Sequence, residues 1–197
     1  NSAALYGVQP PTPITERAPV RGHTTGTYAR TRAQLADYLD LFGASYGGTL
    51  TRLRVAWLCG PRHVALLRQF TGEPVLACGY EQRALSVVHE LDLVDGLVFA
   101  LRHELPGTYN VAAGEPLSFN DIAALTGKQH ACTPLPWLVM RAYVRWRWLR
   151  WRTPPLWVRG LYLGAPLDVS TLADAGWQAS HTARAAFSEA LDVLRAS

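Results

Sequence analysis

The stretch Thr24–Arg32 reads TTGTYARTR and begins the helix around which the rest of the chain is organised. Tyr28 and Arg32 are four positions apart, so on a helix they lie on one face and a phenol sits beside a permanent cation. Upstream, Asn1–Gly7 (NSAALYG) has the pattern of a buried strand running into a loop, with the Ser2 hydroxyl where the strand stops. Together the two segments supply a hydrogen-bond donor, a titratable phenol and a charge that can tune it.

These residues form an ordered pair of motifs, Ser2-x-x-x-Tyr6-Gly7 and, about twenty residues later, Tyr28-x-x-x-Arg32. The pair resembles the signature of the extended short-chain dehydrogenase/reductase family, the NAD-dependent epimerase/dehydratase group, in which a lysine ends the second motif. Further segments that are similar to the family follow in family order: Pro13–Glu16, Leu53-Arg54 with Gly60-Pro61, Val88–Asp92, Tyr109–Ala112 and Gly176-Trp177.

The resemblance implies an NAD- or NADP-dependent oxidoreductase, epimerase or dehydratase that acts on a small carbonyl, alcohol or sugar-like substrate. It makes Tyr28 the acid/base and Ser2 the group that polarises the substrate oxygen. Arg32 would lower the tyrosine pKa, which is near 10 in a free tyrosine, and would meet the cofactor ribose together with Tyr28. Val55 stands where the family's nicotinamide pocket is lined. Without these motifs, Tyr28 and Arg32 would simply read as a surface cation beside a half-buried ring.

The chain departs from the family in two ways. Arg32 replaces the lysine and presents a rigid fork of donors instead of a compact ammonium. The chain has no counterpart of the family's N-terminal half, whose Gly-x-x-Gly-x-x-Gly turn binds the pyrophosphate. Gly43, Gly47 and Gly48 lie between a predicted helix and a predicted strand, whereas the family's turn lies between a strand and the helix that follows it. We therefore expect a truncated chain that is inactive alone and needs upstream sequence or a complementing chain. The alternative is a catalytically silent homologue that serves as a binding or peripheral membrane module.

The substrate positions also differ from the family. Sugar-nucleotide members often carry asparagine at the position of Trp57 and arginine at that of Leu85, both touching the substrate diphosphate. Arg83 is two residues from Leu85 and so on the same strand face, where it either substitutes for that arginine or is a solvated charge at a strand edge. Trp57 and Arg83 are thus the substrate-binding candidates, and a typical nucleotide sugar is disfavoured.

Composition restricts the remaining function classes. The chain has 197 residues, 49% of them hydrophobic, and a mean hydropathy of +0.01, which is typical of one globular unit. It shows no signal peptide and no apolar run long enough to span a bilayer. Three cysteines without metal-ligand spacing predict reduced thiols in the cytoplasm, and six scattered histidines predict no metal site.

The order of patterns predicts an α/β fold: the last strands and helices of an incomplete Rossmann-type parallel sheet, with a small, mainly helical C-terminal substrate domain. Residues 1–60 would be the remnant of the NAD(P)-binding domain, and residues 61–197 the C-terminal domain with strands and helices exchanged back. Periodicity and caps predict strands at 49–59, 74–77, 85–88 and 109–112, and helices at 25–42, 61–70, 90–102, 119–126 and 182–194. Residues 8–23 read as a surface loop, and Trp177 as a plug in the core.

Two helices carry expectations about which face is buried. The first should present an apolar face and stop at Gly43; in the family this helix also helps to form a homodimer. The second should carry an apolar stripe, with Asp92 and Asp95 explained by the helix dipole and His89 as a structural histidine. The apolar positions are Tyr28, Leu35, Tyr38, Leu39 and Phe42 in the first helix and Leu91, Val94, Leu97, Val98 and Leu101 in the second.

Residues 122–167 form an unusual basic region. They contain no acidic residue, seven cations and five of the seven tryptophans. On a helix over Trp137–Trp151, one stripe holds Trp137, Met140, Val144, Trp148 and Trp151, and a second holds Val139, Ala142, Trp146 and Leu149. Two interpretations remain open: arginine stems that cover tryptophans within a small domain, or contact of Trp137–Arg152 with an anionic membrane surface. Nucleic acid is disfavoured, because no binding fold accompanies the patch.

Overall fold

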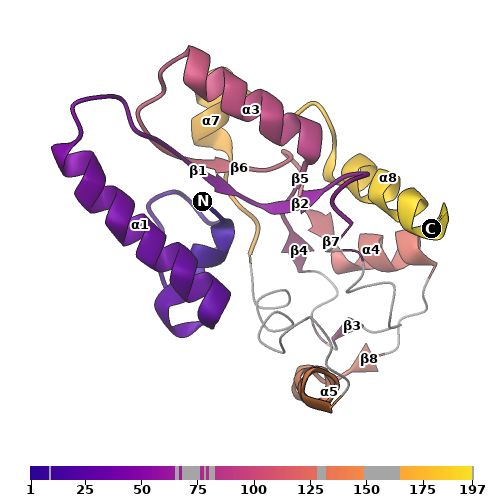
Figure 1. The fold of residues 1–197 in the computed structure, drawn as a ribbon. Coiled ribbons are helices and arrows are strands. Elements are labelled where there is room, and N and C mark those ends of the chain that lie inside the picture. Colours follow the sequence, from indigo (N-terminus) through magenta and orange to yellow (C-terminus); the bar gives the residue numbers. More distant parts are fainter. Residues whose placement is uncertain are drawn as a thin grey trace.

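The computed structural model describes residues 1–8, 10–64, 67, 76–77, 79, 83–127, 132–148 and 165–196. Its helices (Figure 1) are the short 3₁₀ turns η1 (Ala3–Tyr6) and η2 (Gly22–Thr24), then α1 (Thr27–Ser45), α3 (Glu90–Arg102), α4 (Phe119–Thr126), α5 (Leu135–Trp148), α7 (Ser170–Asp174) and α8 (Ala183–Ala196). The strands are β1 (Thr51–Val55), β2 (Trp57–Cys59), β3 (Leu76–Ala77), β4 (Ala84–Leu85), β5 (Val87–His89), β6 (Gly107–Val111), β7 (Leu117–Ser118) and β8 (Cys132–Thr133).

Parallel pairings dominate the strands and confirm the predicted α/β class. β1 runs parallel to β6, with Leu53 opposite Tyr109, and β2 runs parallel to β5. The predicted strand at 49–59 is in fact two strands, because the chain changes partner at Ala56. The Ala56 amide donates to the Val111 carbonyl, and the next amide, that of Trp57, donates to the Ser86 carbonyl. This change of partner leaves a break in the sheet directly after β1.

Helix α3 has the predicted bounds, but the prediction of its apolar stripe as the packed face is wrong. The five side chains of that stripe are between 38% and 80% exposed, whereas Asp92, Gly96 and Ala100 are the buried residues of the helix. The small residues let the helix backbone approach β1, β5 and the ring of Trp177, and a Cβ at Gly96 would lie 3.0 Å from that ring. Close approach of the backbone thus decided the buried face.

Helix α1 differs from expectation in the same way. It runs through Gly43 and ends at Ser45, so the predicted stop at Gly43 is wrong. Its buried residues are Ala29, Ala33 and Ala36, which pack on η1 and η2, while Tyr38 is 62% exposed. Phe42 and Tyr46 stack on each other near the end of the helix, with ring centroids 4.9 Å apart.

The segment 8–23 is more buried than a surface loop. Ile14 and Ala18 are buried, and Ile14 forms a parallel bridge with Leu167. The fully buried Asn110 side chain donates to the Ile14 carbonyl at 2.9 Å and accepts from the Tyr6 hydroxyl at 2.8 Å. The Ile14 carbonyl is thus paired with a buried side chain, in a segment that the sequence pattern assigned to solvent.

The C-terminal elements follow the prediction closely. Helix α4 begins with a capping box between Ser118 and Asp121 and ends at Gly127, which has a φ of 66°. Trp177 is buried in the core, as expected. The buried residues of α8 are Ala183, Ala186, Phe187, Ala190 and Leu191, which are spaced as on one face of an amphipathic helix.

Several predictions fall partly on residues that are not described. Half of the predicted helix at 61–70 lies outside the described residues, as do the first two residues of the predicted strand at 74–77 and Leu149 and Trp151 of the predicted α5 stripes. Within the described part of the chain, no helix has both the length and the apolar character needed to cross a membrane. The division into domains at residue 60 stays a prediction, although β1 and β2 both pair with strands from beyond that point.

Candidate functional site

A pocket of about 530 Å³ opens where β1 ends and the chain passes to β2. Five of the six residues predicted to act at a site line it: Ser2, Tyr28, Arg32, Val55 and Trp57. The remaining candidate, Arg83, is not among its described lining residues. The fold therefore gathers residues from the chain start, α1 and the sheet, and their individual roles stay predictions.

Ser2 is positioned by backbone bonds to the sheet. It forms a parallel bridge with Val55, and the Asn1 carbonyl accepts the Val55 amide at 3.2 Å. The Ser2 hydroxyl also caps η1 by accepting the Ala4 amide at 3.3 Å. The Asn1 side chain donates to the Arg32 carbonyl at 3.2 Å, which fixes this segment against α1. A small hydroxyl is thus held at the carboxyl end of β1.

Tyr28 and Arg32 enter the pocket from the first turns of α1. Gly26, with a φ of 130°, turns the chain so that the helix begins at Thr27. The guanidinium carbon of Arg32 lies 4.9 Å from the centroid of the Tyr28 ring, which is a cation–π contact. The Nε atom of Arg32 is buried and has no hydrogen-bond acceptor among the described residues. A hydrogen-bond donor therefore remains available beside the phenol.

The rest of the lining is mainly apolar and comes from several elements, with Asn1, Thr25, Thr27 and Ser86 as its polar members. The break between the two strands supplies Val55–Leu58, and further side chains come from β4, α3 and the segment after residue 164. The apolar members include Ile14, Leu58, Leu85, Leu93 and Leu167. Because the crevice at the carboxyl ends of parallel strands is where open α/β sheets bind ligands, this is the best-placed ligand site among the described residues.

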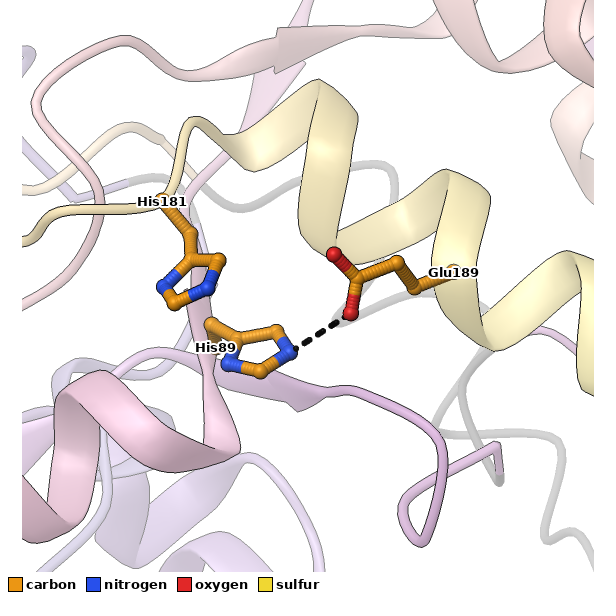
Figure 2. Close-up of side chains that lie close together, drawn as sticks. All are labelled: His89, His181 and Glu189. Atoms are coloured by element: carbon orange, nitrogen blue, oxygen red, sulfur yellow. Dashed lines mark hydrogen bonds and ion pairs between the residues drawn. The ribbon is translucent and has the colours of Figure 1, made fainter.

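A second cluster of polar side chains lies elsewhere and was not anticipated. His89, His181 and Glu189 come from β5, the approach to α8 and α8 itself, and their ligand atoms all lie within 4.8 Å of one another (Figure 2). The His89 Nε2 atom is 3.1 Å from a Glu189 carboxylate oxygen. The two imidazole rings stack, with centroids 4.0 Å apart and planes inclined by 19°.

Two features of this cluster favour a hydrogen-bonded network over a metal centre. The Nδ1 atom of His89 accepts the Leu91 amide at 3.2 Å, so its Nε2 atom carries the proton that it donates to Glu189. A metal ion lies in the plane of each imidazole that binds it. The planes of two stacked, nearly parallel rings do not meet close to their nitrogen atoms, so no single ion could lie in both planes. His89 is therefore a structural residue, as the sequence suggested.

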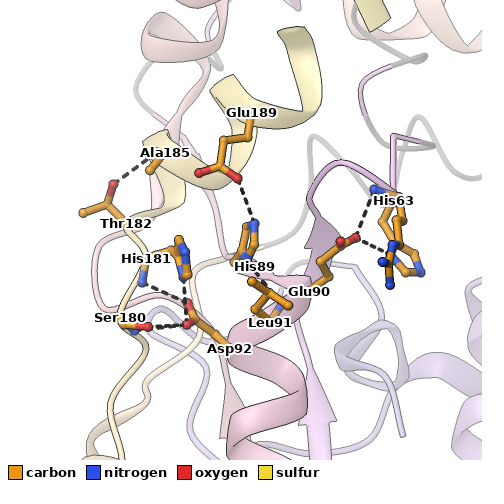
Figure 3. A network of polar contacts seen from close by, with 11 residues as sticks. His63, His89, Glu90, Leu91, Asp92, Ser180, His181, Thr182, Ala185 and Glu189 are labelled. Atoms are coloured by element: carbon orange, nitrogen blue, oxygen red, sulfur yellow. Dashed lines mark hydrogen bonds and ion pairs between the residues drawn. The ribbon is translucent and has the colours of Figure 1, made fainter. Parts of the chain in front are cut away.

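Asp92 is the buried centre of the neighbouring contacts (Figure 3). It is 2% exposed and accepts from the Ser180 hydroxyl at 2.7 Å, the His181 Nδ1 atom at 2.9 Å and the backbone amides of both residues. Burial alone would raise the Asp92 pKa, but the hydrogen bonds from Ser180 and His181 outweigh it and hold the pKa below its ordinary value. Asp95 likewise accepts the Trp177 indole N–H at 2.8 Å.

The helix dipole explained Asp92 and Asp95 in the sequence analysis, and these contacts correct that explanation. Asp92 and Asp95 fasten α3 to the segment 177–181, and no local pattern in the sequence signals partners so far along the chain. The network anchors α8 rather than serving the pocket, whose described lining includes none of its members.

Comparison with known proteins gives one family and a set of solved structures. The profile of the family described as "NAD dependent epimerase/dehydratase family" matches residues 1–112. UDP-glucose 4-epimerase of Thermus thermophilus, solved with NAD, is 23% identical and has a TM-score of 0.68. UDP-N-acetylglucosamine 4-epimerase of Methanobrevibacter ruminantium, solved with UDP-N-acetylmuramic acid, is 18% identical with a TM-score of 0.66.

The whole of this chain aligns with each of these structures but covers only 63% and 61% of their respective lengths. At this level of identity the likeness establishes the Rossmann-type fold. No curated protein sequence matches the chain.

Proposed function

The chain belongs to the NAD-dependent epimerase/dehydratase family, and on that basis we propose that it forms part of an NAD(P)-dependent oxidoreductase, epimerase or dehydratase. The proposed substrate is a small molecule with a carbonyl, an alcohol or a sugar-like group. The observation that carries the proposal is the pocket lined by Ser2, Tyr28 and Arg32 together. The remainder of a dinucleotide-binding fold would come from further sequence or from a complementing chain.

The residues present fit the nicotinamide–ribose part of a dinucleotide. The buried Arg32 Nε atom, which has no acceptor among the described residues, is a donor suited to a ribose hydroxyl. Tyr28 and Arg32 would hold the ribose, and Val55 would line the space for the nicotinamide ring. When bound, a nicotinamide cofactor supplies hydride transfer.

The chain's own residues would handle the proton. Tyr28 would transfer it to or from the substrate oxygen, and Ser2 would donate a hydrogen bond to the same oxygen. Arg32, in contact with the Tyr28 ring, would keep a positive charge beside the phenol throughout. A bound substrate and cofactor would exclude water from the pocket and strengthen that interaction.

The test is a fluorescence titration with NADH and NADPH of the protein at its natural length, followed by single-turnover hydride transfer. Saturable binding is expected, with Tyr28→Phe weakening the cofactor affinity at most about tenfold, the loss of one hydrogen bond, and slowing hydride transfer about 100-fold or more. Tyr38→Phe, on the exposed side of α1, is the matched control and should leave the rate unchanged. Absence of saturable binding, or an unchanged rate in Tyr28→Phe, would refute the proposal.

The outer face of α1 is a proposed homodimer contact. Tyr38, Leu41 and Phe42 are all exposed there, on the side away from the buried alanines. Such a contiguous apolar face suits packing of two copies of the helix. The triple change of these residues to Ser should convert a dimer to a monomer in sedimentation equilibrium. A wild-type chain that stays monomeric at the highest concentration tested would exclude this contact.

A second candidate function, peripheral membrane association, is favoured by the orientation of α5. At about 100° per residue, Trp137, Met140, Val144 and Trp148 share one side of the helix. Trp148 on this side is 78% exposed, whereas Leu138 on the inner side is 8% exposed. Arg141 and Arg147 flank the outer stripe, an arrangement suited to an anionic lipid surface.

Co-sedimentation with phosphatidylserine vesicles tests this candidate. Binding should weaken as salt rises, and Arg141→Glu/Arg147→Glu should reduce the pelleted fraction several-fold. The charge-reversed pair Arg17→Glu/Arg21→Glu, which lies outside the basic region, is the control and should pellet like the wild type. Equal pelleting of the two double variants would remove the membrane interpretation.

A further inference from the structure

Asn1 directly precedes Ser2 at the end of the strand-like segment that pairs with β1. Its backbone nitrogen donates to the Leu53 carbonyl at 2.7 Å, and its carbonyl accepts the Val55 amide at 3.2 Å. These two bonds follow the pattern of a parallel ladder and hold the backbone of Asn1 on β1. The Asn1 side chain lines the pocket beside Ser2. A polar side chain of fixed origin thus lies next to the hydroxyl proposed to act on the substrate.

The side-chain amide of Asn1 joins two segments of the chain. Its Oδ1 atom accepts the Ser2 amide at 2.8 Å, and its Nδ2 atom donates to the Arg32 carbonyl in α1 at 3.2 Å. Both partners are backbone groups of fixed polarity, since an N–H can only donate and a C=O can only accept. The two bonds therefore allow the amide one orientation. They tie the segment that carries Ser2 to the helix that carries Tyr28 and Arg32.

Packing and this amide restrain α1 in different ways. The buried alanines of the helix pack on η1 and set how closely the two elements approach. Burial of apolar surface is non-directional, so it restrains sliding or rotation of the helix only weakly. A hydrogen bond depends on angle as well as distance. The bond from Asn1 to Arg32 therefore helps to fix where along α1 the Ser2 segment lies.

The proposed reaction depends on that placement. The substrate oxygen has to lie within hydrogen-bond reach of both the Ser2 and the Tyr28 hydroxyl. The Ser2 hydroxyl is oriented by the bond that it accepts from the Ala4 amide at 3.3 Å, and a hydroxyl that accepts one bond can still donate its own proton. The two hydroxyls come from different segments, and a displacement of about 1 Å between reacting groups can slow a reaction about 100-fold.

We propose that Asn1 is a positioning residue, whose side-chain amide holds the Ser2 hydroxyl at the separation from Tyr28 that proton transfer to the substrate requires. This inference rests on the proposed function, because it adds a residue to the same site. Asn1 acts through Ser2 and α1, and the proposal assigns it no contact with the substrate. Asparagine suits this role, because its short side chain carries both the acceptor and the donor that the two backbone groups need.

The first test is NMR of the protein at its natural length, without cofactor or substrate. The side-chain amide protons of Asn1 should exchange with solvent about tenfold or more slowly than those of Gln34, which is exposed on α1. Equal exchange of the two side-chain amides would show that the Asn1 amide is free in solution and would overturn the inference.

The second test is single-turnover hydride transfer in a double-mutant cycle. Asn1→Ala should slow the step about tenfold or more and leave NADH affinity within about threefold of the wild type. Asn1→Asp is nearly isosteric but turns an oxygen toward the Arg32 carbonyl, so it should slow the step similarly. Gln34→Glu makes the same amide-to-carboxylate change on the exposed surface of α1 and should leave the rate unchanged.

The cycle separates positioning from a general loss of stability. In a Ser2→Ala background, Asn1→Ala should slow hydride transfer by less than about twofold, because the hydroxyl that it positions is gone. An equal slowing in both backgrounds would assign Asn1 a merely structural role and overturn the inference, as would a wild-type rate in Asn1→Ala. Thermal unfolding of each variant identifies those that fail to fold, and the exchange measurement on the wild type does not depend on any of them.

The outcomes also separate this inference from the proposed function. If Ser2→Ala slows hydride transfer and Asn1→Ala does not, the catalytic proposal stands and the positioning role falls. If Ser2→Ala and Tyr28→Phe both keep the wild-type rate, the catalytic proposal falls, and the role of Asn1 falls with it.

Discussion

His89 and His181 stack ring on ring, with centroids 4.0 Å apart, at the point where the end of β5 meets the approach to α8. A carboxylate lies beside each ring: Glu189 accepts from His89, and Asp92 contacts the Nδ1 atom of His181. The pair thus joins the middle of the chain to its last helix, whose inner face covers the larger hydrophobic core.

The buried carboxylate of Asp92 should be the most sensitive member of this network. Asp92→Asn replaces a charged acceptor of four hydrogen bonds by a neutral amide that cannot accept all of them. We expect the free energy of unfolding to fall by about 2–4 kcal/mol in urea denaturation. The exposed Asp174→Asn should change it by less than about 0.5 kcal/mol. A wild-type midpoint for Asp92→Asn would contradict the network.

Asp92 should also make the free energy of unfolding depend on pH. The Asp92 pKa is lowered in the folded chain, since the hydrogen bonds from Ser180 and His181 outweigh the cost of burial. Its contribution to stability is therefore complete above about pH 4, the ordinary range of an aspartate, and is lost as the pH falls toward the lowered pKa. The difference in unfolding free energy between the wild type and Asp92→Asn should shrink as the pH falls from about 6 to about 3. A difference that stays constant over this range would exclude the assignment.

Two glycines inside helices should respond to alanine with opposite signs. A Cβ at Gly96 would press on the buried Trp177 ring at 3.0 Å, so Gly96→Ala should cost about 1–3 kcal/mol despite better helix propensity. A Cβ at Gly43 meets the flexible end of Leu50, so Gly43→Ala should stabilise by up to about 1 kcal/mol. Thermal unfolding of Gly96→Ala and Gly43→Ala measures the two changes in stability. Stabilisation by Gly96→Ala would show that α3 lies farther from Trp177 than the structure places it.

Cys59 should be chemically inert while the chain is folded. Its thiol is fully buried in the core, and burial raises its pKa to about 12. Because the thiolate is the reactive form, iodoacetamide at about pH 8 should leave the Cys59 peptide unmodified in mass spectra and alkylate it only in urea. Alkylation of the native chain as fast as of the unfolded one would place Cys59 at the surface.

The exposed apolar side of α3 should tolerate charge where the sequence pattern suggests a core. Leu101 is 80% exposed, so Leu101→Lys should change the free energy of unfolding by less than about 0.5 kcal/mol. The adjacent Ala100 is buried against the sheet, and Ala100→Lys should cost about 3 kcal/mol or more. If Leu101→Lys cost more unfolding free energy than Ala100→Lys, the packed face of α3 would be the apolar stripe that periodicity predicted.

Local patterns in the sequence determined much of this protein. The bounds of α3, both caps of α4 and the inner face of α8 follow from capping residues and periodicity within a few neighbouring positions. The placement of Tyr28 and Arg32 on one face also follows from helix geometry alone. Ordered motifs then indicated the family, because each marks a position in a shared fold.

Tertiary structure decided the features that depend on how closely distant segments approach. Whether a helix buries its large or its small residues is set by the neighbour: Trp177 against Gly96 in α3, and η1 and η2 against the alanines of α1. The change of strand partner at Ala56, the pocket that it opens and the four bonds to Asp92 are likewise contacts between distant positions. Such contacts leave no period in the sequence, since their energy depends on packing in three dimensions.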